Sequence, residues 1–152
     1  MAILRVDSQT GEVLGRTARF VMTPQYIWRE MVRMKVLSPI EQVVLQGLSS
    51  FVQFRTNALA EHGRPLTVGE MARALEMDEG NMRKYVKSLL KKNALGKWQS
   101  GSHSEYVMNP ALYHAGHVDP AITVFFNEQR DKYRQEGRLS LKVHGRSTTI
   151  ML

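Results

Sequence analysis

Cysteine is absent from the 152-residue sequence. Its absence excludes a disulfide framework, a thiolate nucleophile, and any zinc finger or iron–sulfur site built on cysteine ligands. Chains without disulfides are typical of reducing compartments. We therefore expect a cytoplasmic protein.

Long apolar runs are missing as well. No stretch approaches the roughly 20 residues that a membrane-spanning helix needs. The first 20 residues carry charges where a signal peptide needs an unbroken apolar segment, among them Arg5, Asp7, Glu12 and Arg16. The sequence predicts a protein without a membrane partner.

Enzyme motifs are also lacking. The chain has no P-loop, no G-x-S-x-G elbow, no H-E-x-x-H helix and no suggestive pair of carboxylates. His114 and His117, with Asp119 nearby, have neither the spacing nor the further ligand of a metal site, and we expect them to be surface side chains. We predict a protein that is not an enzyme, with no metal and no cofactor.

Positive charge, in contrast, is concentrated in one segment. The formal net charge is +7, yet residues 80–104 hold six basic residues and no acid, against 15 basic and 14 acidic residues in the remainder. The six are Arg83, Lys84, Lys87, Lys91, Lys92 and Lys97. A local basic patch suits a polyanion, because each neutralised phosphate releases condensed counterions. A diffuse charge of the same size would be a weaker indication.

Capping and periodicity signals place the expected helices and strands. Ser38 and Thr67 are each followed three residues later by a glutamate, as in a capping box, and Asp78 is an N-cap. The signals predict helices at about 24–36, 39–54, 67–77, 78–93 and 120–135, and a loop at 57–66. Two hairpins are expected, joining Ile3–Val6 to Val13–Leu14 and Leu95–Gln99 to Glu105–Met108, the second with a polar tip at Ser100–Ser104. Residues 139–152 are β-rich but receive no placement.

This order of elements is that of a winged helix-turn-helix. We therefore expect a mainly α fold with small β, long enough to bury one core without staples. Residues 1–22 would form an N-terminal β-hairpin, residues 23–116 a winged helix-turn-helix DNA-binding domain, and residues 117–152 a C-terminal helix and tail that contacts a second copy or a partner. The methionines expected to fill the core are Met22, Met31, Met34, Met71, Met77 and Met82.

The segment Leu66–Asn93 has the dimensions of a helix-turn-helix, whose second helix lies in the major groove of double-stranded DNA. Asn81 suits adenine, and Arg83 or Lys84 suits guanine. The later residues, Lys87, Lys91 and Lys92, are expected at phosphates. The buried face of the same helix should consist of Met82, Val86, Leu89 and Leu90.

The second hairpin adds Lys97 and His103, which we expect near the DNA backbone or the minor groove, while Trp98 is expected to pack beneath the hairpin. A lysine-rich face is usually a solvated surface, but the helix-turn-helix order and the missing acids favour binding. The predicted DNA-binding residues are Thr67, Asn81, Arg83, Lys84, Lys87, Lys91, Lys97 and His103.

One family has a similar pattern. The stretch from Leu37-Ser38-Pro39-Ile40-Glu41 to Tyr106-Val107-Met108-Asn109-Pro110-Ala111-Leu112-Tyr113 resembles the RepL-type plasmid replication initiators, most specifically in its Y-x-x-N-P segment. The resemblance covers about residues 24–116 and implies a winged helix that binds DNA at an origin of replication. Asn109 and Pro110 would end the strand, and Leu112 and Tyr113 would pack back on the core.

Three functions follow from these expectations. The first is a replication initiator of a plasmid or mobile element, in which Phe125, Phe126 and Tyr133 would dock a host replication protein or a second protomer. The second is a dimeric transcriptional regulator that binds a palindrome, with the N-terminal helices or the 120–135 helix at its two-fold interface and host transcription proteins as partners. The third is a protein-binding winged-helix adaptor, which would show no salt-dependent binding to DNA.

Overall fold

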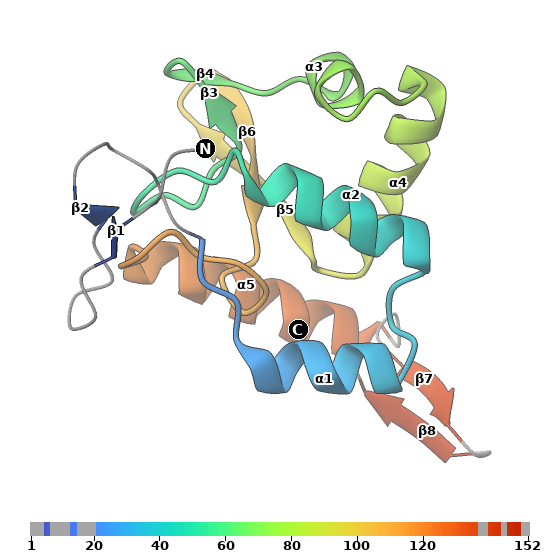
Figure 1. Ribbon diagram of the computed structural model, residues 1–152. Coiled ribbons are helices and arrows are strands. Elements are labelled where there is room, and N and C mark those ends of the chain that lie inside the picture. Colours follow the sequence, from blue (N-terminus) through green and yellow to red (C-terminus); the bar gives the residue numbers. More distant parts are fainter. Residues whose placement is uncertain (1–4, 7–12, 15–20, 137–139, 144–145, 150–152) are drawn as a thin grey trace.

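A computed structural model of the chain describes residues 5–6, 13–14, 21–136, 140–143 and 146–149 (Figure 1). Within these residues the chain forms five helices and four two-stranded antiparallel sheets, a small mixed α/β fold. Its helices are α1 (Gln25–Arg33), α2 (Pro39–Ser49), α3 (Val68–Ala74), α4 (Glu79–Lys91) and α5 (Pro120–Gln135). Its strands are β1 (Arg5–Val6), β2 (Val13–Leu14), β3 (Ala60–Glu61), β4 (Arg64–Pro65), β5 (Leu95–Ser100), β6 (His103–Met108), β7 (Ser140–Val143) and β8 (Arg146–Thr149).

Most of the predicted elements are present at the predicted places. The N-terminal hairpin is confirmed in β1 and β2, and α5 has the predicted bounds. The segment 139–152, which the sequence left unplaced, contributes the β7–β8 hairpin. None of the helices in the described part of the chain is long and apolar enough to cross a membrane.

The main core lies between α2, α3, α4 and the base of the β5–β6 hairpin. Its largest fully buried side chains include Leu45, Leu48, Met71, Met82, Leu89, Leu95, Met108 and Leu112. Burying an aliphatic side chain of this size contributes about 1.5–3 kcal/mol, so this cluster holds α4 firmly on one side. Met22, expected in the core, is half exposed and is the exception among the predicted core methionines.

Helix α2 begins as the sequence predicts and ends earlier. The Ser38 side chain accepts a bond from the Glu41 backbone N–H and the Glu41 carboxylate accepts one from the Ser38 N–H, a complete capping box. The helix ends at Ser49 rather than near Phe54, because the chain turns and Val52 pairs with Leu59 as a β-bridge. Helical periodicity alone missed this end, since Val52, an apolar residue beyond it, forms the β-bridge with Leu59 instead of continuing the helix.

The expected loop at 57–66 contains a short hairpin, so that prediction is wrong in part. Strands β3 and β4 pair Ala60 with Pro65 and Glu61 with Arg64. His62 and Gly63 between them have φ of 50° and 75°, the left-handed pair that a tight two-residue hairpin turn requires. The sequence analysis missed this hairpin because its turn has a histidine at the first position, where Asn, Asp or Gly is usual.

Helix α5 packs on the β5–β6 hairpin through its aromatic side chains. Phe126 is 2% exposed, and the rings of Trp98 and Phe125 meet edge to face with centroids 5.1 Å apart. A Cβ on Gly96 would lie 2.5 Å from Phe125, so this approach needs a glycine. The expectation that Phe125 and Phe126 dock a partner is therefore wrong: their surface is used inside the chain.

Candidate nucleic-acid interface

Helices α3 and α4 form a unit with a short, well-defined link. The Thr67 and Asp78 side chains cap them by accepting bonds from Glu70 N–H at 3.2 Å and Asn81 N–H at 3.0 Å. Helix α3 ends because Glu76 takes a left-handed φ of 52°. Only the first half of the capping box predicted at Thr67 is found.

One face of α4 is buried as predicted. Met82, Val86 and Leu89 are nearly inaccessible to solvent, and Leu90 is half-buried against the same core. These side chains repeat at helical spacing, so the opposite face must point outward. The orientation of the helix is thus fixed by its apolar stripe.

The outward face of α4 is a basic stripe. We call Gly80, Lys84, Lys87 and Lys91 the outer stripe; they lie at i, i+4, i+7 and i+11, on one face of the helix, and all are exposed. None of its three lysines has an ion-pair partner among the described residues. The stripe therefore presents uncompensated positive charge to solvent.

Asn81 begins a neighbouring stripe rather than the outer one. The positions i+4, i+7 and i+11 from it are Tyr85, Ser88 and Lys92, which are half-buried. Asn81 itself is exposed, because it lies in the first turn of α4. The residue predicted to contact adenine thus lies at the edge of the basic face, on the side whose later turns pack against α2.

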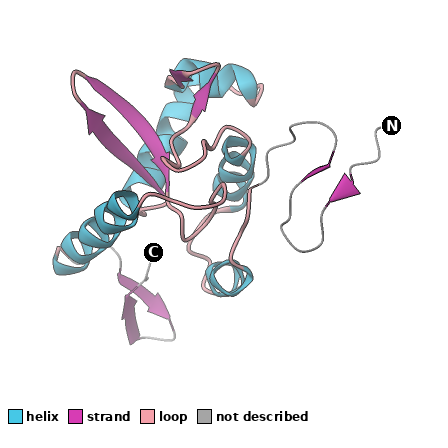
Figure 2. Ribbon diagram, turned by 90° about the vertical axis from the view of Figure 1, so that its left-hand side faces the viewer, coloured by secondary structure: helices cyan, strands magenta, loops and turns pink. Residues whose placement is uncertain are grey.

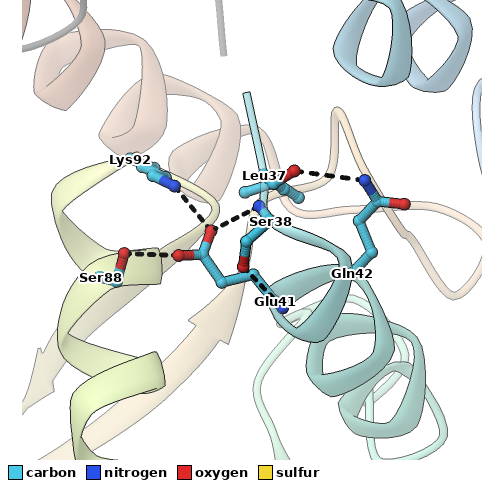
Figure 3. Close-up of polar contacts among 6 residues, drawn as sticks. All are labelled: Leu37, Ser38, Glu41, Gln42, Ser88 and Lys92. Atoms are coloured by element: carbon cyan, nitrogen blue, oxygen red, sulfur yellow. Dashed lines mark hydrogen bonds and ion pairs between the residues drawn. The ribbon is translucent and has the colours of Figure 1, made fainter. Parts of the chain in front are cut away.

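A buried carboxylate fastens this second stripe to α2. Glu41 is 7% exposed, and its carboxylate accepts hydrogen bonds from the Ser88 hydroxyl at 2.8 Å and the Lys92 ammonium at 2.7 Å (Figure 3). The same carboxylate closes the capping box with Ser38, so α2 begins where α4 ends. We call these four residues the Glu41 cluster. Lys92, predicted to contact phosphate, has its ammonium paired with Glu41 in this structure and would have to leave that carboxylate to reach DNA.

Arg83 is also paired. Its Nη2 donates to Oε1 of Glu79 at 2.9 Å, one turn earlier on α4, and both side chains are more than half exposed. Such an exposed pair contributes at most about 1 kcal/mol to stability. Sequence counting missed the pair, because Glu79 lies just outside the acid-free stretch.

The β5–β6 hairpin projects from the body to a free turn (Figure 2). The turn is only Gly101 and Ser102, shorter than the predicted tip, because the strands pair as far as Ser100 and His103. Lys97 pairs with Tyr106, and successive residues alternate faces, so Lys97 and His103 lie on opposite faces. The Lys97 ammonium lies 5.6 Å from the Tyr106 ring centre. Trp98 packs against α5, as predicted.

Two buried asparagines, Asn93 and Asn109, tie the end of α4 to the hairpin and to α5, and a third, Asn57, ties the segment after α2 to the end of β6. The Asn109 amide donates to the Asn93 carbonyl at 2.8 Å, and the Asn93 amide donates to the Phe126 carbonyl at 3.1 Å. The Asn57 amide donates to the carbonyls of Met108 and Tyr113, both at 2.8 Å. As the sequence suggests, β6 ends before Asn109 and the residues Leu112 and Tyr113 pack back on the core; the roles of Asn57 and Asn93 were not predicted.

Two perturbed side chains lie away from α4. Glu30 raises the pKa of the Arg33 guanidinium by hydrogen bonding, and burial raises the pKa of the Tyr113 hydroxyl.

No group of three or more histidine or carboxylate side chains that could hold a metal occurs in the described residues. His114 is half-buried, with Nδ1 3.0 Å from the Gly116 carbonyl oxygen, and His117 is exposed.

Comparison with known proteins adds no relative. The sequence matches no family model and no curated protein, and the structure matches no solved structure.

Proposed function

We propose that this protein binds double-stranded DNA in a sequence-specific manner and is not an enzyme. In this proposal the segment from α2 to β6 is a winged helix-turn-helix, α3 and α4 are its helix pair, and β5–β6 is its wing. The order of the elements and the rigid capped link between α3 and α4 support this assignment.

The observation that carries the proposal is the outer stripe of α4. Gly80 to Lys91 spans about 16 Å along the helix axis, comparable to the roughly 12 Å width of the major groove. Gly80 lets the backbone approach closely near the start of the helix, and Lys84, Lys87 and Lys91 extend toward the phosphates on either side. The buried stripe behind them keeps α4 in place without any contribution from these lysines.

Other side chains complete the surface. The Thr67 hydroxyl accepts the cap bond from Glu70 N–H and keeps its own hydrogen for a phosphate oxygen. Asn81 would read adenine from the edge of the stripe, and Arg83 would read guanine. Lys97, on the hairpin face shared with Tyr106, would contact a phosphate of the flanking backbone. His103 faces the other side of the hairpin and would make the weakest contribution.

For the biological role we propose replication initiation on a plasmid or mobile element, on the resemblance of the Leu37–Tyr113 stretch to RepL-type initiators. A transcriptional regulator is the alternative, because it needs the same DNA surface. A homodimer in either role would need a surface other than the aromatic side of α5, which is buried on β5–β6. Direct repeats beside an AT-rich region would support the initiator, and a palindrome overlapping a promoter would support the regulator.

The test is selection of bound fragments from a random duplex library at about physiological salt. We expect the wild-type protein to enrich a defined motif, with affinity that falls steeply as salt rises. A variant with Lys84, Lys87 and Lys91 changed to glutamine should lose enrichment. The matched control changes Arg29, Lys132 and Arg134, exposed basic residues of α1 and α5, to glutamine and should still enrich the motif. Absence of enrichment and of salt-dependent binding by the wild type would favour the protein-binding adaptor.

A further inference from the structure

The first residue of α4 lies between the two helices of the α3–α4 unit. Oε1 of Glu79 accepts the bond from Arg83 at 2.9 Å. Oε2 of Glu79 lies 3.4 Å from the place that a Cβ would occupy on Gly69, in the first turn of α3. The carboxylate therefore lies beside the bare backbone of Gly69 and holds Arg83 on the α3 side of the helix.

This arrangement leaves most of the guanidinium available. Arginine has five N–H donors in a planar fork, and the pair with Glu79 uses one nitrogen. Reading guanine takes two parallel donors, to O6 and N7. A guanidinium that is already held loses less rotamer freedom when it binds, because part of that cost has been met in the free protein.

The pairing also changes what Arg83 offers to phosphates. Beside a carboxylate its charge is largely cancelled, so it adds little to the counterion release that drives binding to any DNA. The three lysines of the outer stripe have no such partner among the described residues and attract every duplex alike. Two kinds of cation thus lie side by side on α4.

We propose that Glu79 determines specificity by positioning Arg83. It holds the guanidinium ready for a guanine base and withholds its charge from phosphates. This inference rests on the proposed DNA-binding function and assigns the discrimination between sequences to the Glu79–Arg83 pair, whose carboxylate lies beside Gly69 of α3.

The experiment compares Glu79→Gln with Glu76→Gln. Glu76 is an exposed acid near the start of α4 with no ion-pair partner among the described residues, so both variants remove one negative charge from the same region. Binding is measured on the selected duplex and on a random duplex over a range of salt. Both variants should bind random DNA more tightly. Only Glu79→Gln should lower the ratio of selected to random affinity, by about two- to fivefold, the most that the loss of one exposed ion pair can contribute.

Further variants separate the outcomes. In an Arg83→Ala background, Glu79→Gln should have no further effect on the ratio, since the group that it positions is gone. Equal ratios for the two glutamine variants, or a loss that persists without Arg83, would overturn the role of Glu79. A wild-type protein that binds no duplex would instead overturn the proposed function, and this inference with it. Thermal unfolding checks that each variant is folded, as expected for substitutions in an exposed pair.

Discussion

Two successive lysines at the end of α4 have different surroundings. Lys91 is exposed on the outer stripe, whereas the Lys92 ammonium lies 2.7 Å from a carboxylate oxygen of the buried Glu41. One residue along a helix turns the side chain by about 100°, which here is the difference between solvent and a helix–helix junction. The same residue type is therefore exposed to solvent at one position and joins two helices at the next.

This comparison changes how the positive charge of residues 80–104 is interpreted. Of the six basic residues in 80–104, Arg83 and Lys92 are paired with acids from outside that stretch, Glu79 and Glu41. The four without an ion-pair partner in the described chain are Lys84, Lys87, Lys91 and Lys97. The net charge of a segment thus overstates the charge that its surface offers to DNA.

The largest expected effect comes from breaking the buried side of this comparison. Glu41→Ala leaves the Lys92 ammonium and the Ser88 hydroxyl without their acceptor and opens the capping box at Ser38. Breaking a buried ion pair costs about 3–5 kcal/mol, and because Lys92 is partly exposed we expect about 3 kcal/mol less free energy of unfolding. Urea denaturation measures it. The matched control is Glu30→Ala, which breaks the more exposed pair with Arg33 and should cost about 0.5 kcal/mol. Equal losses would mean that the Glu41 cluster does not hold α4.

The next effect belongs to Asn81, at the start of the stripe that ends in the Glu41 cluster. Asn81→Ala should cost about 1–3 kcal/mol on the selected duplex, because a bidentate contact to adenine is lost, and almost nothing on random DNA. Competition binding on both duplexes measures it. Equal losses on the two would remove Asn81 from the base-reading residues and leave Arg83 as the proposed base reader.

The sequence was sufficient for what depends on local signals. The capping box at Ser38, the cap at Asp78 and the 3.6-residue spacing of Met82, Val86 and Leu89 are short-range patterns, and they placed the start of α2, the helix α4 and the buried face of α4 correctly. The bounds of α5 followed from Asp119 and Pro120 in the same way. The basic residues of the outer stripe were identified because helical spacing decides which face they occupy.

What the sequence could not supply was pairing between distant residues. Glu41 and Lys92 are 51 residues apart, and Asn93 meets the Phe126 carbonyl across 33 residues, so no local pattern reports either contact. The aromatic residues of α5 were assigned to a partner because their cover, Gly96 and Trp98, lies in another element. The sequence likewise did not distinguish Lys91 from Lys92 as phosphate ligands, because the partner of Lys92, Glu41, lies in a distant part of the chain.

A direct test of that distinction replaces each lysine by alanine. Lys91→Ala should lower the slope of log affinity against log salt by about 0.9, the loss of one phosphate contact, and leave the free energy of unfolding within about 0.5 kcal/mol. Lys92→Ala should leave the slope unchanged and lower the free energy of unfolding by about 2 kcal/mol, because the buried Glu41 carboxylate loses its cation and keeps only the bonds from Ser88 and Ser38. Salt titrations of DNA binding and urea denaturation measure the two quantities. An equal decrease in slope for both variants would show that Lys92 leaves Glu41 when DNA binds.

The smallest effect is expected on the hairpin, where the same kind of comparison applies to its two faces. Lys97 shares a face with Tyr106 and Leu95, and His103 lies on the face that carries Trp98 and Gly96 toward α5. If only the first face meets the DNA backbone, Lys97→Ala lowers the salt slope by about half a unit and His103→Ala leaves it unchanged. Slopes measured on one random duplex under identical buffer decide between them. The reverse order would place the DNA on the α5 side of the hairpin.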